Sequence, residues 1–200
     1  SMSDEYGDMT VTGDMGPIVF TEAGDGTVSV TMPDSYPITL DFGYDEYMTL
    51  TVSQQNMQMV ASGTPDAISY QMSADRYGVE LTELSPEIAE EVNITGSLWM
   101  NDVSGSYTLA EDNLQRIAYD IAIGSIDADM TAVPTDIDGR FVFVGDVAGM
   151  TVSAAVAMPI GMDMAAMEDM DSPPFAEGFA VSFDYGFGQS DYAFTFQDRG

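Results

Sequence analysis

Residues Ile117 to Ile123 read IAYDIAI, and this stretch indicates the fold. Large apolar side chains stand at every second position, with Ala118, Asp120 and Ala122 between them. Successive side chains of a β-strand point to opposite faces of a sheet, so a period of two is typical of a strand with one buried and one solvated face. The stretch therefore predicts a strand in a sheet that has one apolar face.

The same alternation recurs along most of the chain. The clearest further runs are Val28, Val30 and Met32; Ile38, Leu40 and Phe42; Met48, Leu50 and Val52; Ile68, Tyr70 and Met72; Tyr77, Val79 and Leu81; Phe179, Val181, Phe183 and Tyr185; and Tyr192, Phe194 and Phe196. Turn signals lie between the runs, at Gly24 to Gly26, Pro33-Asp34, Gly63 to Asp66, Asp138-Gly139 and Gly186 to Ser190. We expect an all-β antiparallel meander that forms a curved sheet, a sandwich or a partly open barrel.

Two segments depart from this alternation and predict short helices. Ser85 can cap a helix over 86–92, with Pro86 at its first position. In 159–170, Ile160, Met164 and Met167 recur at helical spacing, and Pro173-Pro174 would end the helix.

The charge of the chain is strongly one-sided. There are 34 Asp and Glu residues against four Lys and Arg, which gives a formal net charge of −30. Such a chain repels nucleic acids and anionic membrane surfaces, and it attracts divalent cations weakly. Because the acidic residues are spread along the whole chain, the composition favours adaptation to a salty environment over a single cation site. Since 45% of the residues are hydrophobic, we expect a folded chain.

We expect a single β domain over residues 8–200, which is a fragment of a longer protein. Residues 1–7 would be a flexible start, in which Ser1-Met2 is typical of the scar left by tag removal. A signal peptide would then have been removed together with the preceding residues.

The residue types exclude most catalytic designs. The chain has no His, Cys or Lys, so it lacks a serine triad, a thiol nucleophile and a Schiff-base lysine. A hydrolase that uses a pair of carboxylates is the remaining catalytic alternative, but 34 acidic residues make close pairs uninformative. We therefore expect a non-catalytic protein without a cofactor.

Two segments are candidate metal sites. Asp136 and Asp138 lie in a short acidic loop that could bind calcium, although the spacing of an EF-hand is absent. The thioethers of Met162, Met164, Met167 and Met170 could bind Cu(I). A solvated turn and the apolar face of a helix explain the same residues without a metal.

We expect this protein to bind a protein partner or an apolar, lipid-like ligand on one face of the sheet. Met and aromatic residues make an adaptable lining for a lipid-like molecule. The predicted lining residues are Met57, Met59, Trp99, Met100, Phe141, Phe143, Phe179 and Phe183. The same side chains would also serve as an ordinary core.

Two stretches of the chain resemble a known family. Gly24 to Phe42, GDGTVSVTMPDSYPITLDF, and Leu50 to Leu81, LTVSQQNMQMVASGTPDAISYQMSADRYGVEL, are similar to an uncharacterised Gram-negative bacterial family catalogued as domain of unknown function 2125. The resemblance implies a periplasmic or secreted protein and a fold rich in strands. It implies no catalytic motif.

Overall fold

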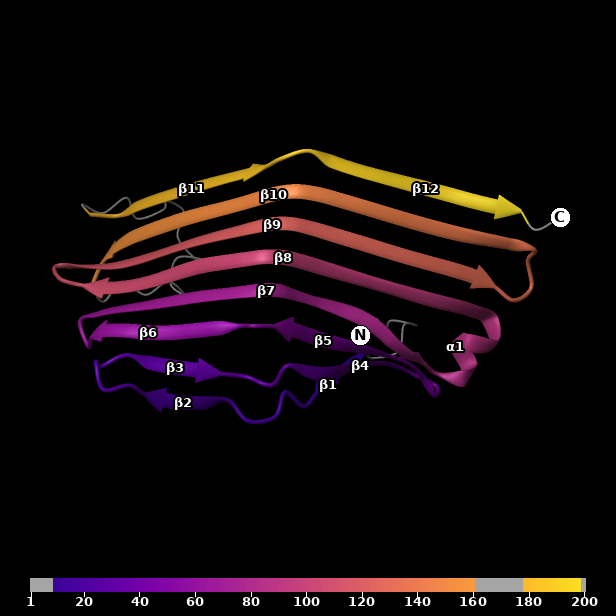
Figure 1. The fold of residues 1–200 in the computed structure, drawn as a ribbon, viewed down its shortest axis with the longest axis horizontal. Helices are drawn as coiled ribbons and strands as arrows, with labels where there is room; N and C mark the ends of the chain where they lie inside the picture. Colours follow the sequence, from indigo (N-terminus) through magenta and orange to yellow (C-terminus); the bar gives the residue numbers. More distant parts are fainter. Residues whose placement is uncertain (1–8, 161–177, 199–200) are drawn as a thin grey trace, which may run out of the picture.

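The computed structural model describes residues 9–160 and 178–198, which form one open antiparallel sheet of twelve strands (Figure 1). This confirms the predicted all-β meander and selects the open curved sheet among its three possible forms. The strands are β1 (Thr10–Gly13), β2 (Val19–Glu22), β3 (Val28–Thr31), β4 (Ser35–Gly43), β5 (Glu46–Gln55), β6 (Gln58–Thr64), β7 (Ala67–Leu84), β8 (Val92–Glu111), β9 (Leu114–Pro134), β10 (Gly139–Pro159), β11 (Ala180–Phe187) and β12 (Ser190–Asp198).

The twelve strands lie in eight parallel positions across the sheet, because some short strands lie end to end beside one longer strand. We call each of these positions a line. β5 and β6 pair with β7 in one register, and β11 and β12 pair with β10 in one register. β3 and β4 form another interrupted line beside β6 and β5, and β2 and β1 form the outermost line beside them. Because β7, β8, β9 and β10 run through without interruption, four interruptions leave eight lines. The turn predicted at Gly186 to Ser190 is therefore wrong, since the chain continues there along β10.

One line of residues crosses the middle of the sheet, and we call it the crease. In register it contains Asn56, Asp75, Asp102, Gly124, Gly149 and Gly188. The backbone φ is 52° at Asn56, 51° at Asp102 and 75° at Gly149, a left-handed conformation that Asn, Asp and Gly adopt most readily. The long strands bend near their middle in Figure 1. The sequence pattern thus encodes the bend at these positions.

The crease changes which residues share a face. Ala74 and Tyr77 are three residues apart on β7, yet both contribute to one central cluster. In an unbroken strand, residues three apart would point to opposite faces. The same change occurs between Met100 and Val103 on β8, and it keeps the apolar side chains of both half-strands on one side of the sheet.

The two faces of the sheet differ sharply in chemistry. The apolar face is made of alternate residues such as Tyr70, Met72 and Val103, and the other face, which we call the polar face, carries the residues between them. Across the four long strands, which are described in full, Glu111 at the end of β8 is the one charged residue on the apolar face. The carboxylates inside these strands and β11 and β12 lie on the polar face or at the crease: Asp75, Glu80, Glu83, Asp102, Asp120, Asp127, Asp129, Asp146, Asp184 and Asp191.

The sheet is a single layer, and few side chains are fully buried. The buried apolar residues are Val30, Val52, Ala74, Val103, Ile123 and Met158. Several residues of the apolar face remain more than a third exposed, among them Tyr70, Leu98, Tyr107 and Met130. Much of the apolar face is therefore uncovered by the described residues.

A short helix, α1 (Pro86–Glu91), joins β7 to β8 and confirms the helix predicted over 86–92. The buried hydroxyl of Ser85 caps it by accepting a hydrogen bond from the backbone N–H of Ile88 at 3.3 Å. The other predicted helix, 159–170, falls mostly outside the described residues, and its first residue, Pro159, is the last residue of β10.

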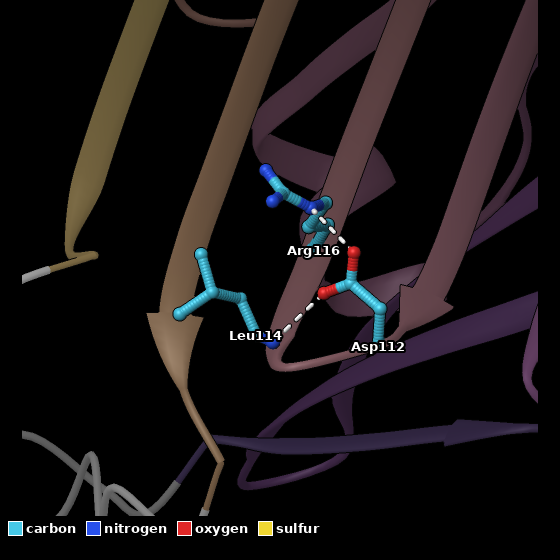
Figure 2. Close-up of polar contacts among 3 residues, drawn as sticks. All are labelled: Asp112, Leu114 and Arg116. Atoms are coloured by element: carbon cyan, nitrogen blue, oxygen red, sulfur yellow. Dashed lines mark hydrogen bonds and ion pairs between the residues drawn. The ribbon is translucent and has the colours of Figure 1, made fainter.

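The turn between β8 and β9 is held by its own carboxylate (Figure 2). Asp112 accepts a hydrogen bond from the backbone N–H of Leu114 at 2.8 Å and lies 3.8 Å from the guanidinium of Arg116. The hydrogen bond, and then the positive charge of Arg116, lower the pKa of Asp112. This carboxylate holds the turn at the start of β9, so it contributes to the register of the β8–β9 hairpin.

Candidate ligand site on the apolar face

The best-formed apolar hollow lies on the apolar face, on the β6 side of the crease. It has a volume of about 350 Å³, within the range of ligand pockets. Side chains from β6, β7, β8 and β9 line it: Met59, Tyr70, Met72, Tyr107, Tyr119 and Ile121, together with Gly105 at its floor. Ser106 and Asp120 also border it, but by the alternation of the strands their side chains belong to the polar face. We call it the Met-Tyr hollow.

The hollow follows from two neighbouring rows of the sheet. Met59, Met72, Gly105 and Ile121 are cross-strand partners in one row, and Tyr70, Tyr107 and Tyr119 are partners in the next. Gly105 has no side chain, so its row is lowest there, and a Cβ at this position would lie 3.4 Å from Cε of Met72. The rings of Tyr70 and Tyr107 are 6.0 Å apart and form one wall. The result is a depression between flexible thioethers and rigid rings.

A larger hollow of about 690 Å³ lies on the opposite, polar face. Its lining side chains include Gln58, Gln71, Ser104, Ser106 and Thr151, with Asp120 as the charged group. No hydrogen bond within the described residues links the side chains of these lining residues to one another, so they do not form a common polar site. A large volume by itself does not make a binding site, so the smaller Met-Tyr hollow is the better candidate for a ligand site.

The predicted lining residues are spread over the sheet. Met59 lies in the Met-Tyr hollow, and Met57 and Met100 pack against the central cluster of Ala74, Val103 and Ile123. Phe141 and Phe143 lie on the far side of the crease, beside the ring of Phe194. Phe183 lies on the exposed edge strand β11, and Phe179 just precedes that strand. The structure therefore brings one of the eight, Met59, to the hollow.

Trp99 lies on the polar face, opposite the predicted site. It pairs in register with Gly78 and Asp127, while the next residue, Met100, packs on the apolar side. The guanidinium carbon of Arg76 lies 3.9 Å from the centre of the Trp99 ring, which is a cation–π contact. The Nε of Arg76 is buried and has no hydrogen-bond partner. Trp99 thus stabilises a cation in the polar face.

Residues that form the hollow were missed as a site. The alternation placed Tyr70, Met72, Tyr119 and Ile121 in strands, but the run of glycine and polar residues around Gly105 hid the floor of the hollow. The hollow is formed by residues that lie opposite one another on neighbouring strands. Identifying them requires the pairing register of these strands, which the sequence pattern does not specify.

The predicted metal ligands are not brought together in the described residues. Asp136 and Asp138 lie in the exposed turn between β9 and β10, and Met162, Met164, Met167 and Met170 lie outside the described residues. In residues 9–160 and 178–198 there is no group of three or more His, Cys, Asp or Glu that could hold a metal ion.

Three carboxylates do lie side by side on the polar face. Asp127, Asp146 and Asp191 are direct cross-strand partners on β9, β10 and β12. Lost hydration, then a hydrogen bond with Asp127 and the charges of Asp127 and Asp191, raise the pKa of Asp146. Like charges directly opposite one another destabilise a sheet, so this row is a local cost that salt screens.

Comparison with known proteins gives no relative of the chain. No family model matches, and no curated protein or solved structure matches either. Within the described residues, no helix has the length and apolar character needed to span a membrane.

Proposed function

We propose that this protein binds an uncharged, lipid-like ligand on the apolar face of its sheet, with an aliphatic chain in the Met-Tyr hollow. The observation that carries the proposal is the lining of that hollow, where thioether, aromatic and aliphatic side chains from four strands surround Gly105. The role is binding without catalysis. The acidic composition and the resemblance of Gly24 to Phe42 favour a role outside the cytoplasm.

The geometry of the face supports an elongated ligand. β8, β9 and β10 contain 20, 21 and 21 residues, so the face extends for about 65–70 Å along the strands. It is uncovered over much of that length, and large uncovered apolar surfaces in soluble proteins mark binding sites. Met59 and Met72 adapt to chains of different shape because their thioether side chains are flexible.

The distribution of charge supports an uncharged ligand. Apart from Glu111 at the end of β8, the acidic residues of the long strands lie on the polar face or at the crease, and the apolar face of these strands carries no Arg or Lys that could pair with an anion. The net charge of −30 also repels an anionic head group. A fatty alcohol should therefore bind more tightly than the fatty acid of the same chain length.

A fluorescence titration with a pyrene-labelled fatty alcohol, without detergent, tests the proposal. We expect saturable binding that weakens about tenfold in Met72→Gln, because the change puts a polar amide of similar size into the hollow. The matched control is Met130→Gln, since Met130 lies on the same face but outside the hollow and is 39% exposed. Its affinity should equal that of the unchanged protein.

Two outcomes would count against the proposal. Absence of saturable binding would leave a protein partner as the occupant of the apolar face. Equal weakening by Met72→Gln and Met130→Gln would show that the probe adsorbs to the whole face and that the hollow is not a site.

A further inference from the structure

The last line of the sheet, formed by β11 and β12, has a free edge. Within residues 9–160 and 178–198, both strands pair with β10 and no strand pairs with their outer side. Met150 pairs with Phe187 and Val147 pairs with Ser190, so one register runs through both strands. The free edge therefore extends from Ala180 to Asp198 as one line (Figure 1).

This edge carries a continuous row of exposed apolar side chains. Each is at least 60% exposed: Val181 60%, Phe183 61%, Tyr185 61%, Phe187 65%, Tyr192 72%, Phe194 64% and Phe196 67%. All belong to the apolar face, because the change of alternation at Gly188 keeps both half-strands in phase. Neighbouring rings along the row are tilted against each other, for example Phe183 and Tyr185, whose centroids are 5.8 Å apart.

The edge lacks the usual protection against pairing. Natural edge strands carry Lys or Pro, are short, or contain a bulge. The chain has no Lys, neither β11 nor β12 contains Pro, and their register with β10 is unbroken. The opposite edge is protected, since β1 and β2 have four residues each and Pro17 lies between them.

We propose that two copies of this chain associate edge to edge, with β11 of one copy antiparallel to β12 of the other. The two-fold axis passes between Gly188 and Gln189. Such an interface uses the same surface on both copies and closes on itself. Main-chain hydrogen bonds along both half-strands supply the affinity, as in the addition of a strand to a sheet.

The sequence of the edge is self-complementary about that axis. In the centred register Tyr185 faces Tyr192 of the second copy, Phe183 faces Phe194, and Val181 faces Phe196. Aromatic and β-branched pairs stabilise antiparallel strands. Each ring that stands exposed in one copy would lie between two lines of chain in the dimer.

The charges of the edge fit the same register. Asp184 faces Ala193 and Asp191 faces Gly186, so no carboxylate of the edge lies opposite another carboxylate. Two copies at −30 still repel each other at long range, and salt screens that repulsion. The dimer should therefore become tighter as the salt concentration rises.

The dimer would join the two apolar faces. A two-fold axis perpendicular to the sheet places both apolar faces on the same side, and the aromatic row lies along their junction. The proposal does not depend on the Met-Tyr hollow, which lies on β6 to β9 and is separated from the edge by β10. Failure of either proposal leaves the other standing.

Sedimentation velocity of the full chain over a range of protein concentrations tests the dimer. The mass of the unchanged protein should rise from 21.5 kDa toward twice that value, at lower concentration in high salt. In Phe194→Lys the dimerisation constant should weaken at least about tenfold, because a buried ring is lost and Lys protects edges. The change also reduces the net negative charge, so general repulsion cannot explain a weaker dimer.

Phe20→Lys is the matched control. Phe20 is 68% exposed and lies in β2 on the other edge, so the substitution changes charge and exposed surface by the same amount. It should leave the dimer intact. Circular dichroism verifies that both variants keep the strand content of the unchanged protein.

Introduced cysteines test the register, since the chain has no Cys. Tyr185→Cys and Tyr192→Cys on one chain should give a covalent dimer on mild oxidation, and each change alone should not. A monomer at all salt concentrations, a Phe194→Lys variant that dimerises as tightly as the unchanged protein, or cross-linking by either single variant would overturn the proposal.

Discussion

Ile123 in the centre of the sheet and Phe194 on its edge are both large apolar residues of the apolar face, yet Ile123 is 7% exposed and Phe194 is 64% exposed. Ile123 has Val103 and Met150 as partners on both sides, whereas Phe194 has Phe143 on one side. No second layer covers either residue in the described chain. In a one-layer sheet, burial therefore comes from flanking strands, and stability should fall from the centre to the edge.

The largest expected effect is at the centre. Ile123→Ala should lower the free energy of unfolding by about 2–4 kcal/mol, because it removes buried methyl groups between two strands. Phe194→Ala should change it by less than about 0.5 kcal/mol in dilute, low-salt solution, where the chain is monomeric. Urea denaturation followed by circular dichroism measures both. Equal losses would contradict the gradient from centre to edge.

The crease should be the next most sensitive part of the sheet. Gly149 and Gly24 both have open space where a Cβ would be, but the backbone φ at Gly149 is +75°. Gly149→Ala should therefore cost about 1–2 kcal/mol through backbone strain alone. Gly24→Ala, the matched control, should be nearly neutral. A neutral Gly149→Ala, measured by the same denaturation, would show that the strands bend for another reason.

The row of carboxylates between β9 and the edge should respond to pH. The raised pKa of Asp146 means that the folded state holds its proton more tightly than the unfolded state, whose pKa is near 3.8. The folded state therefore loses stability as the pH rises from the unfolded pKa through the higher folded pKa. Asp146→Asn should raise the melting temperature at pH 7, and the gain should vanish below the unfolded pKa. A gain that persists at low pH would contradict this assignment.

The smallest effect should come from the β8–β9 turn, and its pH dependence has the opposite sign. The lowered pKa of Asp112 stabilises the folded state above the unfolded pKa of about 3.8, and the contribution is lost as the pH falls through the lower folded value. Asp112→Ala should lower the melting temperature slightly at pH 7 and leave it unchanged in strong acid. A decrease in melting temperature that is the same at every pH would contradict this explanation. It would show that the substitution acts through the backbone of the turn and not through the hydrogen bond that the carboxylate accepts from Leu114.

Much of the fold could be predicted from the alternation of residues. Runs such as Ile117 to Ile123 predicted strands with one apolar face, and Ser85 with Pro86 predicted the short helix. The prediction failed where a local signal has two meanings. Glycine and polar residues at Gly186 to Ser190 are typical of a hairpin turn, but the same residues allow a strand to bend and continue.

The candidate site could be predicted less well. The kind of lining residue, Met and aromatic, was visible in the sequence, and Met59 was named. The hollow itself depends on Gly105 lying between Met72 and Ile121, which come from three different strands. That arrangement depends on register over 49 residues of chain, from Met72 to Ile121, and a one-residue slip would send each side chain to the other face.

By itself, the sequence determined the class of fold, the two unlike faces and the absence of His, Cys and Lys, because these depend on residue type and on a local period of two. The tertiary structure alone decided that the sheet stays open, that the crease crosses the six lines from β5 and β6 to β11 and β12, and that Phe183 and Phe194 stand on a free edge. These properties depend on which distant strands become neighbours. The alternation within a strand specifies which of its residues share a face. Pairing between distant strands decides which of these residues have neighbours on both sides and are buried.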